Sequence, residues 1–536
     1  MWRKLVEKIE YPQWARTQQR FVRLDSLDRF LDGTIYDHLE YSFYEEEDSR
    51  GKYIPVEQRR PSAQTNLPGK VAKMIARKLF AGRHTPRIVH ENEQVQQWLM
   101  TLIAQGSLYE RMLQASIWGS VGSVAVTFKL VEGALKVDVW RAKYCYPIFN
   151  ATGDLSMLRV QYTVSGRTML KNGFEKDIEG RPLDLDQMYW FVRDWEETTE
   201  RTYMPIKDDQ YDPLDGPPNR LIEDTSRTYT HTLGFVPGVW MVNLAGGAAP
   251  DGACTWEPAV NLCVDADYTL SQLGRGVRYN AAPQLVIVGD LKGDDDPGRI
   301  QRGPVSVLHF DADTRLDDGT KMGGGDAKLL EMVGNGVTAG MKYVEYVLRL
   351  AVEAISSSRK NPEEAHGTLS GRAMELMDDA FFDLVHELRS AYGDEGFVPL
   401  LRKIVRACCK TGAAPSGCSE EVALQFGLRW PRLYGTTPQD EVNLMESMAM
   451  GVQTQLVDLE VAKSYVQAQM DLEDYHRAQP APETGSAEPL TELTPADGSE
   501  PPPEQYTEGS NTDPLRPGPV GRVLPKRHVG PKQKSL

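Results

Sequence analysis

The stretch KLLEMVGNGVTAGMKYVEYVLRLAVEAISSS, residues 328–358, decides the fold. Its apolar positions step by three and four, which predicts one long amphipathic helix; they are Val337, Met341, Val344, Leu348, Val352 and Ile355. Charged residues lie off this stripe, namely Lys342, Glu345, Arg349 and Glu353. At about 1.5 Å per residue, about 24 helical residues span roughly 36 Å.

A second helix precedes this stretch, and a small insert separates the two. Apolar spacing predicts the earlier helix from Thr255 or Trp256 to about Tyr279. Within the insert, residues 284–288 and 305–310 have the composition of strands, and the loops between are rich in Asp and Gly. We therefore expect a small α/β unit between two long helices.

The chain after residue 358 is expected to be mostly helical. Asn361-Pro362 disfavours helix at Asn361, and Gly367 permits a tight turn, so 359–369 forms a break. The apolar spacing then predicts further helices over residues 370–391, 397–409, 438–450 and 456–477.

The part before residue 255 has the pattern of an α+β domain with an antiparallel sheet. Helices are predicted over 70–80, 91–105 and 107–119. Strands are predicted over 121–130, 134–140, 157–164, 188–198 and 238–244, the first two joined by the hairpin signal Val131-Glu132-Gly133. The acidic, aromatic segment 41–48 is expected on the surface.

Composition excludes several classes of protein. The 536 residues carry a formal net charge of −16, and the six cysteines have neither zinc-site nor dense disulfide spacing. No apolar run of about 20 residues occurs, so we expect no membrane span, and the N-terminus is not expected to be a secretory signal. The proline-rich tail 478–536, acidic and then basic at its tip, is expected to be disordered.

The sequence offers no recognisable catalytic constellation. It has no P-loop and no HExxH or nucleophile-elbow motif. The acidic run Asp294–Asp296 is more typical of a solvated loop than of a two-metal site, and the nine histidines lack ligand spacing. We therefore expect no catalytic residues, no metal and no cofactor, and a structural or assembly role rather than an enzyme.

Three stretches carry a family resemblance. Residues 60–82 place Asn66 before a helix that ends at Gly82; residues 256–271 begin the first long helix with Trp256-Glu257-Pro258; residues 369–377 read LSGRAMELM. In this order they resemble the portal proteins, or head–tail connectors, of tailed bacteriophages. The resemblance covers roughly residues 55–477, but the usual crown turn is missing near 450–456.

The resemblance implies a portal fold that assembles as a ring. Its implied parts are a wing (1–254 and 370–410), two stem helices (255–280 and 330–358), a clip (281–329), a tunnel loop (359–369) and a mostly helical crown (411–477), before the tail (478–536). Such rings look twelve-fold and close by rotational symmetry. A channel should not hold phosphates tightly, which the net charge of −16 suits.

The family also implies partners and a site. The ring would stand at one capsid vertex of the virion, after assembly in the host cytoplasm, and pass double-stranded viral DNA. It would bind the terminase large subunit, major capsid and scaffolding proteins, and head-completion, adaptor and tail proteins, with no membrane. The implied channel-facing residues of the tunnel loop are Arg359, Lys360, Asn361, Glu363, Glu364 and His366.

Alternatives stay open at this stage. The chain could be another minor head or adaptor protein of a phage, or, less in keeping with its motifs, a nucleic-acid-processing enzyme such as a nuclease. The tunnel loop could be a plain helix–helix connector. The basic tail tip, Arg516 to Lys534, could contact DNA, scaffold or capsid, or only solubilise the chain.

Overall fold

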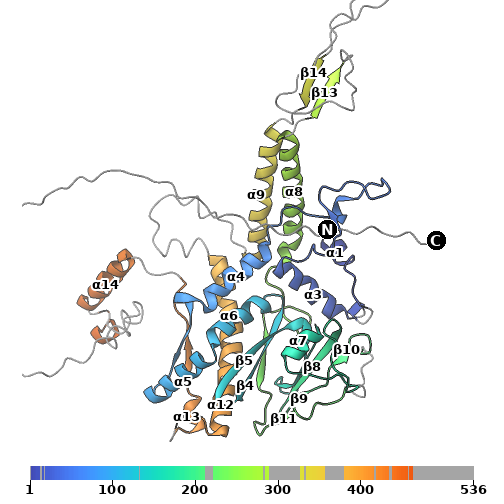
Figure 1. Ribbon diagram of the computed structural model, residues 1–536. Helices are drawn as coiled ribbons and strands as arrows, with labels where there is room; N and C mark the ends of the chain where they lie inside the picture. Colours follow the sequence, from blue (N-terminus) through green and yellow to red (C-terminus); the bar gives the residue numbers. More distant parts are fainter. Residues whose placement is uncertain are drawn as a thin grey trace, which may run out of the picture. The chain divides into compact units, whose positions relative to one another are not determined.

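The computed structural model describes residues 2–12, 15–16, 18–131, 133–211, 221–281, 284–288, 326–330, 334–356, 379–415, 418–433, 438–454, 456 and 458–462. Helices and antiparallel sheets are both present (Figure 1), so the predicted α+β class is confirmed.

The first sheet is the predicted hairpin with one added strand. β4 (Ser123–Val131) pairs antiparallel with β5 (Ala134–Arg141) and, on its other side, with β12 (Gly238–Val242). Helices α5 (Glu93–Gln105) and α6 (Leu108–Gly119) follow the predicted bounds closely. The Asn92 side chain caps α5 by accepting hydrogen bonds from the amides of Gln94 and Val95.

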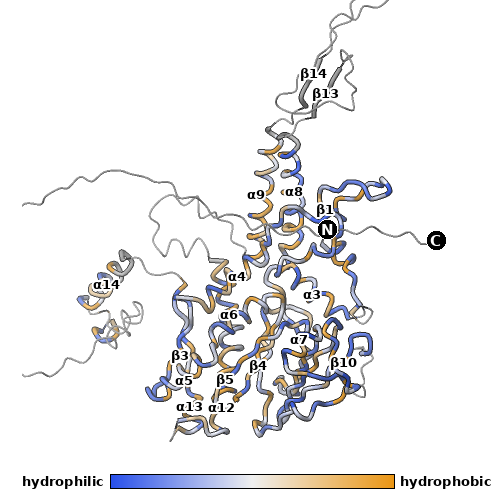
Figure 2. Tube along the Cα trace, in the orientation of Figure 1, coloured by the Kyte–Doolittle hydropathy of each residue, from blue (hydrophilic) through white to orange (hydrophobic). Residues whose placement is uncertain are grey.

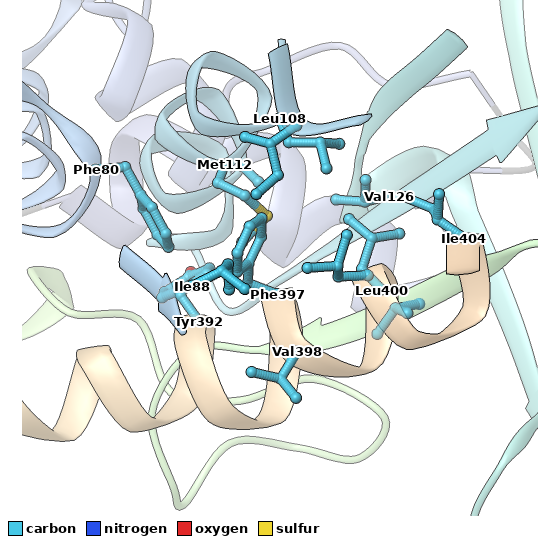
Figure 3. Close-up of a cluster of buried hydrophobic side chains, with 14 of the residues drawn as sticks. Phe80, Ile88, Leu108, Met112, Val126, Tyr392, Phe397, Val398, Leu400 and Ile404 are labelled. Carbon is cyan, nitrogen blue, oxygen red and sulfur yellow. The ribbon is translucent and has the colours of Figure 1, made fainter. Parts of the chain in front are cut away.

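The main core lies between this sheet and the C-terminal helices. Figure 3 shows Leu108 and Met112 of α6, Val126 of β4 and Leu400 and Ile404 of α12 (Val398–Thr411) in one buried cluster. Each such side chain contributes about 1.5–3 kcal/mol when it leaves water. Residues far apart in sequence are thereby held in one body.

A second antiparallel sheet confirms the remaining strand predictions. Its order is β11-β9-β8-β7-β6, and β10 also pairs with β8. The bounds are β6 (Cys145–Phe149), β7 (Leu155–Ser165), β8 (Met188–Glu196), β9 (Thr199–Thr202), β10 (Ile206–Lys207) and β11 (Tyr229–Thr230), with the short helix α7 (Gly166–Lys171) after β7.

The N-terminal region holds structure that the sequence patterns did not reveal. Helices α1 (Trp2–Val6) and α3 (Gln19–Asp32) precede the predicted helix, which is α4 (Leu67–Phe80). The expectation that 41–48 is a surface segment is wrong in part, because Phe43 is only 1% exposed. One side of this segment packs into the core while its acidic residues stay outside.

The C-terminal part is helical, as predicted, where it is described, but the predicted gap between the helices 370–391 and 397–409 is itself helical. α11 (Asp379–Arg389) continues through a π-helical turn (Ser390–Phe397) into α12, with α13 (Glu420–Ala423) and α14 (Pro438–Gln453) further on. β15 (Gly427–Arg429) pairs with β3 (Arg87–Val89). The first part of the predicted helix 370–391 and most of 456–477 lie outside the described residues, as does the tail.

The insert between the long helices is corrected at one point. β13 (Gln284–Val288) is the predicted strand, and its antiparallel partner is β14 (Asp326–Leu330). Residues 328–330 were expected to begin the long helix, but they form this ladder, and the helix α9 begins at Gly334. A short apolar run fits helix and strand alike, and pairing with β13 decides for strand. The predicted strand 305–310 lies outside the described residues.

Candidate assembly and channel site

Two long helices, α8 and α9, form the most distinctive feature of the described chain (Figure 1). α8 spans Val260–Ala281 after a short 3-10 turn at Glu257–Ala259, and α9 spans Gly334–Ser356. Both agree with the predicted long helices except at their first residues.

Small residues let the two helices approach closely. Ala259 and Cys263 pack with Ala351 in one cluster, and Ala266 packs with Val344 and Val347 in the next. At Gly340 a Cβ atom would lie only 2.3 Å from Cδ2 of Leu273. Because α8 positions rise along the chain as α9 positions fall, the helices run antiparallel.

The face of α9 that α8 covers differs from the predicted stripe. Val344, Val347 and Ala351 form the buried line, whereas Met341 is 53% exposed and Val352 is 39% exposed. The small residues Gly340 and Ala351 allow the closest approach of α8 to α9, so the buried residues of α9 lie on the face that contains these two positions. Two members of the predicted apolar stripe therefore face away from the subunit's own core.

Apolar side chains consequently flank the buried line of α9 on both sides. At 100° per residue, Met341 and Val352 lie on one side and Tyr343 and Tyr346 on the other. The two tyrosines are about half exposed, and Tyr343 Oη donates to Asp265 Oδ2 of α8 (3.0 Å). Hydrophobic residues recur along α9 in Figure 2. Only the first flank was predicted from the sequence, because the apolar spacing indicated a single stripe.

Polar contacts fix the base of α8 to the N-terminal region. Asp267 is 5% exposed and accepts hydrogen bonds from the Thr65 amide (2.8 Å), the Thr65 hydroxyl (2.9 Å) and the Tyr36 hydroxyl (3.1 Å). One turn on, the Ala63 amide donates to Ser271 Oγ (3.1 Å). Burial raises the pKa of Asp267 above its ordinary value even though these donors and Lys70 favour the carboxylate.

The same region supports α8 further along. Arg275 forms an ion pair with Glu46, and the Arg278 guanidinium lies 4.4 Å from the ring centroid of Tyr44. Tyr268 Oη donates to the backbone oxygen of Arg59 (3.2 Å). Residues 41–65 thus hold α8 in place, a role that their sequence did not indicate.

Charges on the two helices balance. α8 carries Asp265, Asp267, Arg275 and Arg278, and α9 carries Lys342, Glu345, Arg349 and Glu353. The pair is therefore formally neutral, and the net charge of −16 belongs to other parts of the chain.

The predicted tunnel-loop residues lie outside the described residues. Arg359, Lys360, Asn361, Glu363, Glu364 and His366 all fall within 357–378, as does the whole motif at 369–377. Most of the predicted clip, between β13 and β14, is also outside them. The motif at 60–82 is described: Asn66 caps α4, its Oδ1 accepting from the Gly69 amide (3.3 Å).

Within the described ranges, no group of three or more His, Cys, Asp or Glu residues could hold a metal ion. No helix there is long and apolar enough to cross a membrane.

Comparisons with known proteins add the following. No family model matches the chain, and no curated protein matches it. One similar solved structure is described as "Virion of native gene transfer agent (GTA) particle", with 12% identity, TM-score 0.36, and coverage of 74% of this chain and 89% of that one.

A second similar structure is described as "Neck of empty GTA particle computed with C6 symmetry". It has 11% identity and TM-score 0.34, and the match covers 72% of this chain and 86% of that chain. Identities and TM-scores this low carry no argument about fold or function. The class that the described geometry itself defines is an α+β chain with a projecting antiparallel helix pair.

Proposed function

We propose that this chain is a portal protein of a tailed phage, one subunit of a ring, of about twelve copies, at a capsid vertex. Double-stranded DNA would enter and leave the head through the ring. The terminase large subunit, capsid and scaffolding proteins, and later head-completion, adaptor and tail proteins would be its partners. The role is structural, without catalysis, in the virion and, during assembly, in the host cytoplasm.

The observation that carries the proposal is the pair α8–α9 with apolar side chains on both flanks of α9. A head-to-tail ring needs two different surfaces on each subunit, and these close on each other by rotation. Met341 and Val352 on one flank, and Tyr343 and Tyr346 on the other, supply such a pair of surfaces. The hairpin β13–β14 between the helices fits the order helix, insert, helix of the resembling family.

Channel function is compatible with the charges on these helices. A collar rich in Lys and Arg would hold phosphates and stop DNA from sliding. The formal neutrality of α8 and α9 avoids such a collar.

The test is electron microscopy with native mass spectrometry of the purified chain and its variants. Wild type should form closed rings with a central hole. Met341→Glu or Val352→Glu should give subunits that melt like wild type, because both positions are exposed, but that fail to close rings, because a charge enters an apolar contact. Gln272→Glu, an exposed α8 position, adds the same charge as a control and should leave rings intact.

Monomers or dimers of wild type at micromolar concentration would contradict the portal proposal and favour an adaptor protein. DNA cleavage by a monomer would favour an enzyme. Rings that form equally in all three variants would leave the portal role standing but show that α9 does not make the ring contact.

A further inference from the structure

An unusual charge pattern surrounds helix α4. The segment from Gln58 to His90 contains no Asp or Glu, although the whole protein has a formal net charge of −16. The same segment holds eight cations: Arg59, Arg60, Lys70, Lys73, Arg77, Lys78, Arg83 and Arg87. Local charge here is opposite in sign to that of the whole protein.

The fold places three of these cations on one exposed face. Val71, Ile75 and Leu79 of α4 are buried, and Lys70, Lys73 and Arg77 are exposed on the other side. Steps of three and four residues align them along about 10.5 Å of helix. We call these three residues the α4 basic stripe.

The stripe makes no ion pair within the described residues, although the charge of Lys70 is near enough to Asp267 to favour its carboxylate. Lys70, Lys73 and Arg77 form no ion pair with any residue of the described part of the chain, and Asp383 and Glu387 of neighbouring α11 do not reach them. The three cationic side chains are therefore exposed and not neutralised by an ion pair in the described chain, so they can meet an anion.

Helix α12 makes the contrast clear, because three of its four cations serve the fold. Lys403 donates to the Gly238 carbonyl (2.8 Å), Lys410 donates to the Leu233 carbonyl (2.6 Å), and Arg406 pairs with Glu420 (3.4 Å). A cationic helix without acidic residues can therefore still use its charges within the fold. On α4, by contrast, Lys70, Lys73 and Arg77 are exposed.

Positive potential continues past the end of α4. His84 is buried just beyond it, and burial first, then the charges of Lys78, Arg83 and Arg389, lower the pKa of His84 to about 4. Arg83 is exposed and, like the stripe, has no ion-pair partner in the described residues.

We propose that the α4 basic stripe binds the phosphate backbone of double-stranded DNA without reading its sequence. Evenly placed Lys and Arg on a rigid surface are the electrostatic footprint of backbone binding. A protein partner would need an apolar centre to the interface, and Met74 is the one exposed large apolar side chain of α4. This proposal does not require the ring or the channel, and it stands if either fails.

The experiment measures binding of the full chain to labelled duplexes of about 30 base pairs, in two unrelated sequences, by fluorescence anisotropy over a salt series. The test variant is Lys70→Gln, Lys73→Gln, Arg77→Gln, which keeps good helix formers. The control is Lys136→Gln, Lys171→Gln, Arg402→Gln, three exposed cations on other elements. All proteins are compared in the same oligomeric state, after thermal melts confirm folding.

Wild type should bind both duplexes alike, with log K falling linearly against log salt. Loss of three phosphate contacts should reduce the slope by about 2.7. If the plots of log K against log salt for wild type and the glutamine variant meet at about 1 M salt, the variant binds about 500-fold more weakly than wild type at about 0.1 M salt. The control should match wild type, and the charge-preserving variant Lys70→Arg, Lys73→Arg, Arg77→Lys should retain binding even if the glutamine variant proves unstable.

Equal affinities and slopes for wild type and the glutamine variant would overturn the proposal. The proposal would also be overturned if the glutamine variant lost binding to poly-glutamate but bound the duplexes like wild type, because the α4 basic stripe would then bind an acidic protein. Loss of binding in the charge-preserving variant would also contradict it, since phosphate attraction needs charge and not a particular side chain.

Discussion

Replacing Asp267 tests whether the base of α8 is held by one buried carboxylate. In Asp267→Ala, the Thr65 amide and the buried Tyr36 hydroxyl lose their acceptor. Each orphaned buried donor costs about 1–3 kcal/mol. Relief of the cost of burying a carboxylate offsets part of this loss. We therefore expect the folded state to lose about 2–4 kcal/mol.

Asp267→Asn is the matched control, because its amide oxygen can still accept from Thr65 while the Tyr36 hydroxyl can turn to accept. Burial raises the pKa of Asp267 in the folded state, so the carboxyl favours folding when protonated, and that contribution is lost as pH rises through the folded pKa. Asn, which never ionises, should therefore be at least as stable as wild type at neutral pH and gain no advantage in acid.

The assays are thermal melting and hydrogen exchange of the Thr65 amide. Asp267→Ala should lower Tm and speed exchange at Thr65, whereas Asp267→Asn should do neither at pH 7. If the alanine variant melts with wild type and Thr65 exchanges at the wild-type rate, the carboxylate does not hold α8 and the reasoning fails.

Two further predictions concern the body of the subunit. Lys143 lies between Asp25 (2.9 Å) and Asp28 (3.3 Å) of α3, so Lys143→Ala should destabilise the fold by about 3 kcal/mol, because two buried carboxylates lose their lysine. Burial raises the pKa of Asp25, but Lys143 and Arg29 outweigh burial and hold that pKa low, so the loss of stability should shrink in melts toward about pH 4 as the carboxyls protonate. A loss that does not change with pH would contradict this. Gly119→Ala would place a Cβ 2.2 Å from Tyr392 Oη, a buried hydroxyl that donates a hydrogen bond to Asn243, and should destabilise the fold by about 1–3 kcal/mol. The control Gly274→Ala, whose Cβ would have nothing within 4 Å, should be neutral or stabilising in the same melts. Equal melting temperatures of the two variants would refute this account of packing.

Local patterns predicted most elements of the described chain. The turn signal Val131-Glu132-Gly133 between two strand-like runs predicted the β4–β5 hairpin, and the spacing of apolar residues predicted α4, α5, α6, α8 and α9. These signals are local because a helix or a hairpin satisfies its backbone hydrogen bonds among near neighbours. Helix α3 was missed because its buried side mixes Leu27 with charged Asp25 and Asp28, which pair with Lys143 from distant sequence.

The candidate site was predicted only in outline. The sequence placed two long helices around an insert, and the resemblance supplied a loop, 359–369, that lies outside the described residues. It could not show that Met341 and Val352 face outward, because periodicity marks every apolar position alike. Which apolar residues of α9 are buried depends on the face that α8 covers. The small residues Gly340 and Ala351 decide which face that is, because they allow the closest approach of α8.

By itself, then, the sequence determined the α+β class, the long helices, the β4–β5 hairpin and the acid-free segment around α4, because these depend on residue order alone. Tertiary structure decided which face of α9 is covered, that Asp267 joins α8 to Thr65, and that Lys403 and Lys410 of α12 bind backbone carbonyls while Lys73 and Arg77 of α4 form no ion pair within the described residues. Contacts between residues hundreds of positions apart arise only when the core closes, and no local pattern encodes them.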